Sequence, residues 1–160
     1  MPEILVHPFP PLYDEESRVL ILGSFPSVVS RKKAFYYANP GNRFWRVLAA
    51  VFEEEIKDRR TFCLEHHIAL WDVIASCSIH GSSDASIDNV TVNDIGSLVA
   101  KTKIRHIFAT GKKAAGLYSL YIHEDIPFTG LPSTSGANAS YHLEDLINAY
   151  RIIRTSLEEA

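Results

Sequence analysis

The stretch AFYYANPGNRFW, residues Ala34–Trp45, combines two compositions that rarely occur together. Its aromatic residues suit a buried core, whereas Asn39, Pro40, Gly41 and Asn42 in its middle interrupt a strand or a helix. Flat aromatic faces beside amide donors and acceptors suit the face and edge of a planar heterocycle. The alternative interpretation is an aromatic minicore under a long loop that leads into a helix.

The overall composition is that of a folded protein. The chain has 160 residues, of which 46% are hydrophobic and 22% charged, and this predicts a single domain over residues 1–160. No apolar run reaches the roughly 18 residues of a membrane span, and the first residues do not resemble a signal peptide. We therefore expect a cytoplasmic protein that does not enter a membrane. The two cysteines are too few for a Cys-rich metal site.

The charge distribution leaves nucleic-acid binding open. The formal net charge is −3, so a polyanion would need a local basic face. Arg31, Lys32 and Lys33 precede the aromatic stretch, and Arg43 and Arg46 lie at its end. These residues are compatible with such a face, and equally with an ordinary solvated surface.

Apolar runs alternate with segments of helical periodicity, which predicts an α/β layer fold around a parallel sheet. The expected strands are Arg18–Leu22, Ile68–Ile74, Ile104–Ala109 and Ile126–Thr129. The expected helices begin near Asn42 and cover Asp58–His67, Val92–Lys101, Gly111–Tyr121 and Tyr141–Leu157. Residues 1–17 are expected to be an irregular arm, and Gly23–Pro40, Ala75–Asn89 and Leu131–Ala139 to be loops. Loops that follow parallel strands gather at one edge of the sheet, where ligands bind.

Two of these loops have compositions that suit a ligand. GSFPS, Gly23–Ser27, follows the first strand, and its glycine allows the backbone to turn toward a ligand. LPSTSGANA, Leu131–Ala139, offers hydroxyl and amide groups that suit phosphate oxygens. Each alone is equally compatible with an ordinary connection.

Several other activities are excluded or weakly supported. ATGKK, Ala109–Lys113, lacks the upstream glycine and following hydroxyl of a nucleotide-triphosphate loop, although the helix start near Gly111 could hold one phosphate. The seven histidines show no metal-ligand spacing, so no metal is expected. GSFPS is not a nucleophile elbow, and the candidate loops contain few carboxylates, Asp72, Asp84 and Asp88.

The order and spacing of six segments resemble the uracil-DNA glycosylase superfamily, closest to its hypoxanthine-DNA (deoxyinosine) glycosylase group. The segments are GSFPS, FYYANPGNRFW, IALWDV, SSDASIDN, IFATGKKA and LPSTSGANA, which span most of the chain. The resemblance implies a three-layer α/β fold with a central four-stranded parallel sheet flanked by helices.

The resemblance also implies roles for individual residues. The base-binding pocket would comprise Gly23, Ser24, Phe25, Pro26 and Ser27, completed by Tyr37 and Phe44. The DNA-binding residues would be Lys32, Lys33, Arg43, Ser133, Thr134, Ser135 and Asn138. Many relatives carry Asp or Asn where this chain has Phe25, and the uracil enzymes carry a histidine that the segment LPSTSGANA lacks here. Both departures fit the hypoxanthine group better.

The group that orients the attacking water must then come from elsewhere, and the candidates are Asn39 and Asn42. Pro40 biases Asn39 toward extended geometry, outside a helix. Asn42 lies where a helix begins and is the weaker candidate because a cap would occupy its side chain. Both are retained as candidate catalytic residues.

The resemblance predicts a monofunctional DNA glycosylase that removes hypoxanthine, with uracil and xanthine as further candidate bases. Its partner would be DNA containing a deaminated base, it would act as a monomer, and it would need no metal or organic cofactor. The alternative is a non-catalytic binder of nucleic acid or nucleotide, which Phe25 favours. A small-molecule hydrolase fits poorly, because no nucleophile and base pair is visible.

Overall fold

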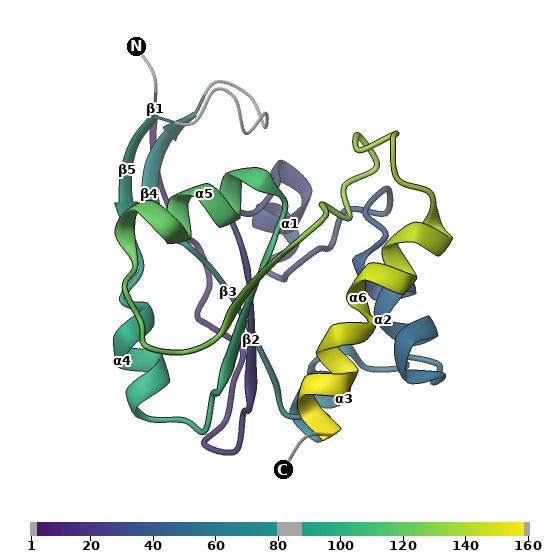
Figure 1. Ribbon diagram of the computed structural model, residues 1–160. Coiled ribbons are helices and arrows are strands. Elements are labelled where there is room, and N and C mark those ends of the chain that lie inside the picture. Colours follow the sequence, from purple (N-terminus) through teal and green to yellow (C-terminus); the bar gives the residue numbers. More distant parts are fainter. Residues whose placement is uncertain (1–2, 80–87, 159–160) are drawn as a thin grey trace.

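A four-stranded parallel sheet forms the centre of the protein, in the strand order β3-β2-β6-β7 (Figure 1). The computed structural model describes residues 3–79 and 88–158. The strands are β2 (Val19–Gly23), β3 (Ile68–Asp72), β6 (His106–Thr110) and β7 (Phe128–Leu131). The α/β fold with a parallel sheet is confirmed, with β6 and β7 each beginning two residues later than expected.

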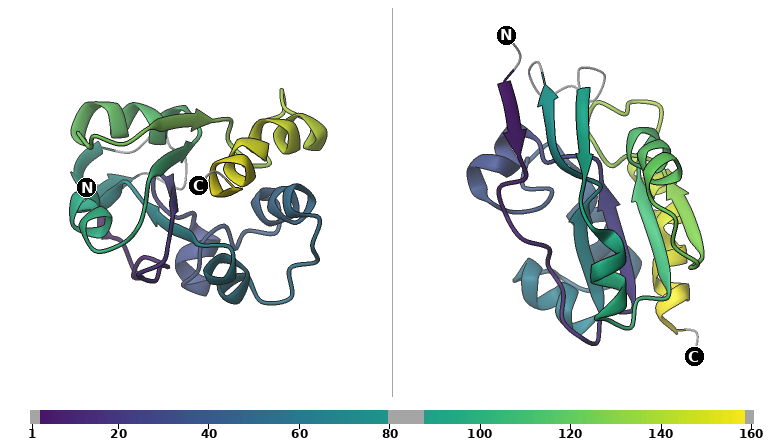
Figure 2. Two further views of the ribbon diagram at one scale, coloured as in Figure 1. Left: turned by 60° about the horizontal axis from the view of Figure 1, so that its bottom comes forward. Right: turned by 90° about the vertical axis from the view of Figure 1, so that its left-hand side faces the viewer.

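Helices cover both faces of this sheet because the side chains of β2 alternate between two cores. Val19 and Ile21 belong to a core with α2 (Phe44–Phe52), α3 (Arg59–Glu65) and α6 (Leu143–Glu158). Leu20 and Leu22 belong to the opposite core, with α4 (Ile95–Ala100) and α5 (Lys112–Tyr121). The two groups of helices lie on opposite sides of the sheet in Figure 1 and in the left-hand view of Figure 2.

A second, antiparallel sheet has the order β1-β4-β5, from β1 (Glu3–Val6), β4 (Ile74–Ile79) and β5 (Asp88–Val92). The irregular arm expected for residues 1–17 and the loop expected for Ala75–Asn89 were therefore wrong where these strands lie. The strand β4 was not predicted because the small residues of its ASCS segment show neither an apolar run nor alternation of apolar and polar residues. Residues 80–87 of that expected loop lie outside the described residues.

The expected loop Gly23–Pro40 contains a short helix, α1 (Val28–Lys33), which the sequence prediction missed. Ser27 caps it, since its hydroxyl accepts a hydrogen bond from the Ser30 backbone N–H at 3.1 Å. The helix ends at Lys33 and is followed by Ala34, whose φ of 53° is left-handed. Ser30 then accepts a hydrogen bond from the Ala38 backbone N–H at 3.0 Å, which ties the aromatic stretch to this helix.

The remaining helices differ from expectation mainly at their first residues. The helix expected from Asn42 begins at Phe44, and the helix expected from Val92 begins at Ile95, capped by Asp94. Across residues 3–79 and 88–158, every helix falls short of the length and apolar content that crossing a bilayer requires.

Candidate active site

A cleft of about 1240 Å³ opens at the carboxyl ends of the parallel strands, where the fold class places ligands. It brings together most of the predicted site residues from distant parts of the chain. Those that line it are Gly23, Ser24, Phe25, Pro26, Ser27, Tyr37, Asn39, Asn42, Ser133, Thr134, Ser135 and Asn138. Lys32, Lys33, Arg43 and Phe44 are not among the residues that line it.

Asp72 and Gly23, which are paired at the ends of β3 and β2, form the floor of this cleft. The Asp72 carboxyl group lies over Gly23, where a Cβ atom would stand 2.5 Å from Oδ1 and 3.3 Å from the Tyr37 hydroxyl. Any larger residue at position 23 would therefore clash with the Asp72 carboxyl group. Oδ2 contacts His7, whereas Oδ1 has no hydrogen-bond partner among the described residues. Because Asp72 lines the cleft, Oδ1 is its oxygen available to a ligand there.

Tyr37 supplies an aromatic wall. Its ring stacks on Phe44 with the centroids 3.8 Å apart and the planes 14° apart. Its hydroxyl lies 3.2 Å from the Thr110 hydroxyl, and its φ of 52° is left-handed. Burial, and then the Asp72 charge, raise the pKa of Tyr37 well above its ordinary value, so the phenol stays neutral. Phe44 is completely buried behind this ring and supports it from outside the cleft.

Phe25 occupies the position where many relatives were expected to carry an acid or an amide. Its ring is 9% exposed and contacts the His7 ring edge-on at 5.9 Å. The Arg31 guanidinium lies 5.6 Å from the centroid of the same ring. Phe25 can therefore shape the cleft, but it offers no group that could orient water.

The two asparagines have different surroundings. Asn39 is exposed, and its Oδ1 accepts a hydrogen bond from the Gly41 backbone N–H at 2.9 Å. The Asn42 Oδ1 accepts from the Phe44 backbone N–H at 2.9 Å and from the Thr134 hydroxyl at 2.8 Å. Asn42 is therefore committed to the start of α2 and to the neighbouring loop. Asn39 is the more accessible amide.

Arg43 connects the aromatic stretch Ala34–Trp45 to the loop over residues 132–141. Its guanidinium donates hydrogen bonds to the backbone carbonyls of Tyr141 at 2.6 Å, Ser135 at 2.9 Å and Asn138 at 3.1 Å. Its backbone N–H donates to the Thr134 carbonyl at 2.9 Å. The side chain expected to approach phosphates thus braces the loop over residues 132–141, and direct DNA contact by Arg43 stays a prediction.

Some polar groups of that loop form hydrogen bonds within the protein. Thr134 is 1% exposed and donates its hydroxyl to Asn42, while the Asn138 amide donates to the Ser133 carbonyl at 3.0 Å. Gly136 packs against the Gly41 carbonyl, which would lie only 2.8 Å from an added Cβ. Ser133, Ser135 and Asn138 are half-buried at the rim, and contacts with phosphate stay predictions for all of them.

Three further residues of the site were not predicted as functional from sequence. They are Asp72, whose position directly after a buried strand was a usable signal, Thr110 and Lys112, which is exposed on the rim. His7, beneath Asp72, was missed because its segment was expected to be irregular. Lys32 and Lys33 are exposed in the last turn of α1, and their role in DNA binding is untested.

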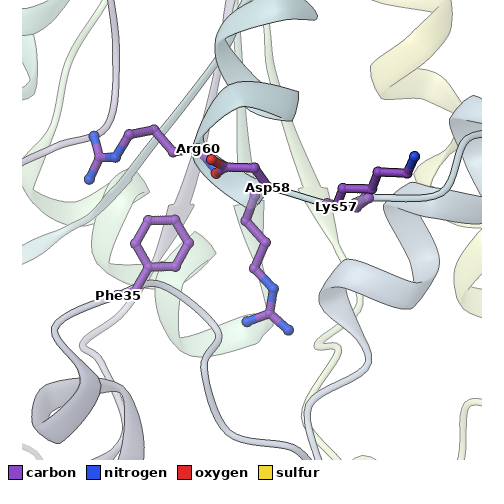
Figure 3. Close-up of a pocket in the computed structure, with 6 residues that line it drawn as sticks. Phe35, Lys57, Asp58 and Arg60 are labelled. Atoms are coloured by element: carbon purple, nitrogen blue, oxygen red, sulfur yellow. The ribbon is translucent and has the colours of Figure 1, made fainter.

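A second concavity lies against the start of α3, around Phe35, Asp58 and Arg60 (Figure 3). Arg60 lies 5.8 Å from the centroid of the Phe35 ring, and the Lys57 side chain points away from Phe35. Asp58 is occupied as the cap of α3. The concavity contains none of the predicted site residues. Within the described residues, no group of three or more His, Cys, Asp or Glu side chains is placed to hold a metal ion.

Comparison with known proteins gives consistent matches. A family model described as the uracil DNA glycosylase superfamily matches residues 10–153. A hypoxanthine DNA glycosylase from Methanosarcina acetivorans is 38% identical over 139 residues, which cover 83% of this chain and 88% of the relative. Another from Methanosarcina barkeri is 32% identical over 136 residues, covering 81% and 86%.

A solved structure matches as well. The solution NMR structure of a protein from Methanosarcina acetivorans, described as a candidate uracil DNA glycosylase, has a TM-score of 0.79 and 33% identity. The match covers 95% of this chain and 99% of that chain. The chain therefore belongs to the uracil DNA glycosylase superfamily, whose members are DNA glycosylases. The resemblance drawn from the six sequence segments is confirmed.

Proposed function

We propose that this protein is a monofunctional DNA glycosylase that removes hypoxanthine from deoxyinosine in DNA, with uracil and xanthine as further candidate bases. The observation that carries the proposal is the carboxyl group of Asp72 on the floor of the cleft, where Tyr37 also lines the wall. The two relatives named hypoxanthine DNA glycosylase support the same substrate.

The chemistry of the base edge separates hypoxanthine from adenine, the base that it derives from. Deamination converts adenine to hypoxanthine, and a ring nitrogen that was an acceptor then carries hydrogen beside a carbonyl. Uracil and xanthine share this N–H. Asp72 Oδ1 can accept a hydrogen bond from such an edge, whereas adenine would direct a lone pair at it. A buried mismatch of this kind is strongly rejected, because it leaves polar groups unpaired.

The reaction follows from base flipping. The damaged base leaves the stack most easily when it is mispaired, and it enters the cleft against Tyr37. The bond between C1′ and the base nitrogen then breaks as positive charge develops on the sugar. The exposed amide of Asn39 holds the attacking water, and the protein contributes positioning and electrostatic stabilisation. No metal or organic cofactor has a role in these steps.

We infer that the loop over residues 132–141 grips the DNA backbone beside the flipped nucleotide. Ser133, Ser135 and Asn138 lie at its rim, and Lys112 adds a positive charge there. Hydroxyl, amide and lysine groups of this kind position phosphates without reading sequence. Arg43 keeps the loop in place through its backbone carbonyls.

Cleavage assays on oligonucleotides test this function. Duplexes with one deoxyinosine, deoxyuridine or deoxyxanthosine are incubated with the protein and then treated with alkali, which breaks the strand at an abasic site. We expect cleavage at deoxyinosine and none at deoxyadenosine. Breaks before alkali treatment would contradict a monofunctional enzyme, and no abasic site with any deaminated base would overturn the proposal.

Phe25 favours one alternative, a protein that binds deaminated bases without excising them. It fills the position of a water-orienting side chain with a ring that is 9% exposed. Binding to deoxyinosine DNA without release of the base would select this alternative.

The proposal includes a monomer in the cytoplasm. The two cysteines, Cys63 and Cys77, are free and buried, which suits a reducing compartment. A single species of about 18 kDa by light scattering would support the monomer, and a concentration-dependent mass would contradict it. Fractionation of the source cells would test the location.

A further inference from the structure

We propose that His7 is a positioning residue for Asp72, which holds Oδ2 so that Oδ1 faces the cleft as a hydrogen-bond acceptor. This inference rests on the proposed function, in which Oδ1 accepts the N–H of the deaminated base. His7 follows β1, far from Asp72 in sequence, yet its Nε2 lies 2.7 Å from Oδ2. Both side chains are 5% exposed.

The hydrogen inventory of this pair fixes the role of Oδ1. His7 Nδ1 lies 2.8 Å from the Phe9 carbonyl, and because a carbonyl only accepts, Nδ1 carries a hydrogen. The contact between Nε2 and Oδ2 also holds one hydrogen, whichever of the two atoms it is bonded to. In both arrangements Oδ1 carries no hydrogen and can only accept.

The pair also removes an electrostatic conflict. A base that leaves as its anion would be repelled by an isolated carboxylate against its edge, since like charges disfavour each other. With His7, the imidazole and carboxyl groups together carry no net charge in either arrangement. The site therefore keeps an acceptor for the base N–H without placing an uncompensated negative charge beside the leaving group.

The surroundings of His7 hold the imidazole in this orientation. Its backbone N–H donates to the Ala75 carbonyl at 2.7 Å, which continues the pairing of β1 with β4. Its ring contacts the rings of Phe9 at 4.7 Å and Phe25 at 5.9 Å, both edge-on. The pairing of β1 with β4, which the sequence did not predict, thus positions the His7 imidazole against Asp72, which lines the cleft.

Three substitutions separate positioning from packing. His7→Leu fills much of the same space without a donor, whereas His7→Gln places an N–H near the position of Nε2. His66→Leu is the matched control, because His66 forms a half-exposed pair with Glu54 at 3.2 Å outside the cleft. The measurements are the single-turnover rate on deoxyinosine duplex, the Kd for the same duplex carrying an abasic-site analogue, and the Tm.

We expect His7→Leu to lower the rate about 10²-fold, the scale of losing one preorganised polar group. His7→Gln should stay within about tenfold of the wild type, and His66→Leu should equal it. Abasic-site binding should be unchanged throughout, because the base is absent. Equal rates for His7→Leu and His7→Gln, or a wild-type rate for His7→Leu, would overturn the positioning role.

Two outcomes need a separate comparison. If His7→Leu melts below the assay temperature, His7→Asn replaces it, because the shorter amide falls short of Oδ2. It should be slower than His7→Gln, and equal rates would again overturn the inference. If the wild type cleaves no deaminated base, the proposed function fails and this inference fails with it. Wild-type cleavage that is insensitive to His7 contradicts the inference alone.

Discussion

The carboxyl oxygen Oδ1 of Asp72 lies directly over Gly23, 2.5 Å from where a Cβ atom on that residue would stand. The two residues are partners in the register of β2 and β3, so moving their backbones apart would disrupt the pairing of these strands. The acceptor on the cleft floor therefore depends on the absence of a side chain at position 23.

Gly23→Ala should displace the Asp72 carboxyl group and lower the single-turnover rate on deoxyinosine DNA by at least about tenfold. Gly116→Ala is the matched control, because nothing lies within 4 Å of its added Cβ. Gly116 lies inside α5, so that change should raise stability by up to about 1 kcal/mol and leave the rate unchanged. A wild-type rate for Gly23→Ala would show that the position of Asp72 is not critical.

The Tyr37 ring, which stacks on Phe44, should matter more for the reaction than the Tyr37 hydroxyl does. Tyr37→Phe keeps the ring and loses the contact with Thr110, so we expect a rate within about tenfold of the wild type. Tyr37→Ala removes the surface on which the base stacks, which costs about 1–3 kcal/mol per base in comparable sites. Kd measurements with deoxyinosine DNA and with abasic DNA check this, since only the former should weaken strongly. Equal weakening on both would indicate a general loss of structure.

Replacing the exposed lysines of α1 and replacing Arg43 should have different effects on the salt dependence of DNA binding. Lys32 and Lys33 are exposed, and replacing both by alanine should flatten the dependence of log Kd on log salt by about one unit or more if they contact phosphates. Arg43→Lys keeps its charge, but its single Nζ cannot reach all three carbonyls that two guanidinium nitrogens contact, so we expect an unchanged salt slope, a lower Tm and lower duplex activity. An unchanged slope in the double lysine variant would place those side chains away from DNA.

Alkaline pH should destabilise the fold through Cys63. Burial raises the pKa of Cys63 to about 12, above the ordinary thiol value of 9.0. The stability from this buried neutral thiol is fully present below pH 9 and is lost as pH rises from 9 toward 12. The slope reaches about 1.4 kcal/mol per pH unit for one group.

Urea denaturation between pH 9 and 10 measures this slope. Cys63→Ala should lower the free energy of unfolding at every pH, because it leaves a cavity, but its dependence on pH should be shallower. The tyrosines contribute a similar loss only at higher pH, since their ordinary pKa is 10.0. Identical slopes for the two proteins would show that the thiol does not titrate as described.

The parallel sheet could be predicted from sequence because its strands have strong local signals. RVLIL and IALWDVI are short apolar runs bounded by turn residues, and they form β2 and β3 with small shifts at their ends. The antiparallel sheet could not be predicted in this way. β4 consists largely of small residues, and β1 exposes Ile4 and Val6, so neither strand shows the expected pattern of burial.

Only the parts of the candidate site that lie in sequence motifs could be predicted. The segments that contain Ser24, Asn39 and Ser133 were found, and the fold brings them to one cleft. The pairing of Asp72 with His7 depends on tertiary structure, because it crosses two sheets and joins residues with a sequence separation of 65. The different surroundings of Asn39 and Asn42 likewise emerge only when the loops meet.

Asn39 is the central residue of the proposed mechanism because its amide is exposed in the cleft. The Asn42 amide oxygen, in contrast, accepts hydrogen bonds from Phe44 and Thr134. Asn39→Ala should fold normally and bind deoxyinosine DNA, with a single-turnover rate about 10²–10³ below the wild type. Asn39→Asp should retain part of the rate, since a carboxylate also holds water. Asn42→Ala should lower the Tm, because a helix cap and the Thr134 contact are lost.

The most direct measurement uses chromatography to follow the release of free hypoxanthine from a deoxyinosine duplex under single-turnover conditions. It compares the wild type with Asn39→Ala and Asn42→Ala. We predict stoichiometric release by the wild type and a loss of about 10²–10³ in rate for Asn39→Ala with DNA binding intact. No hypoxanthine from the wild type, or a wild-type rate for Asn39→Ala, would contradict the account.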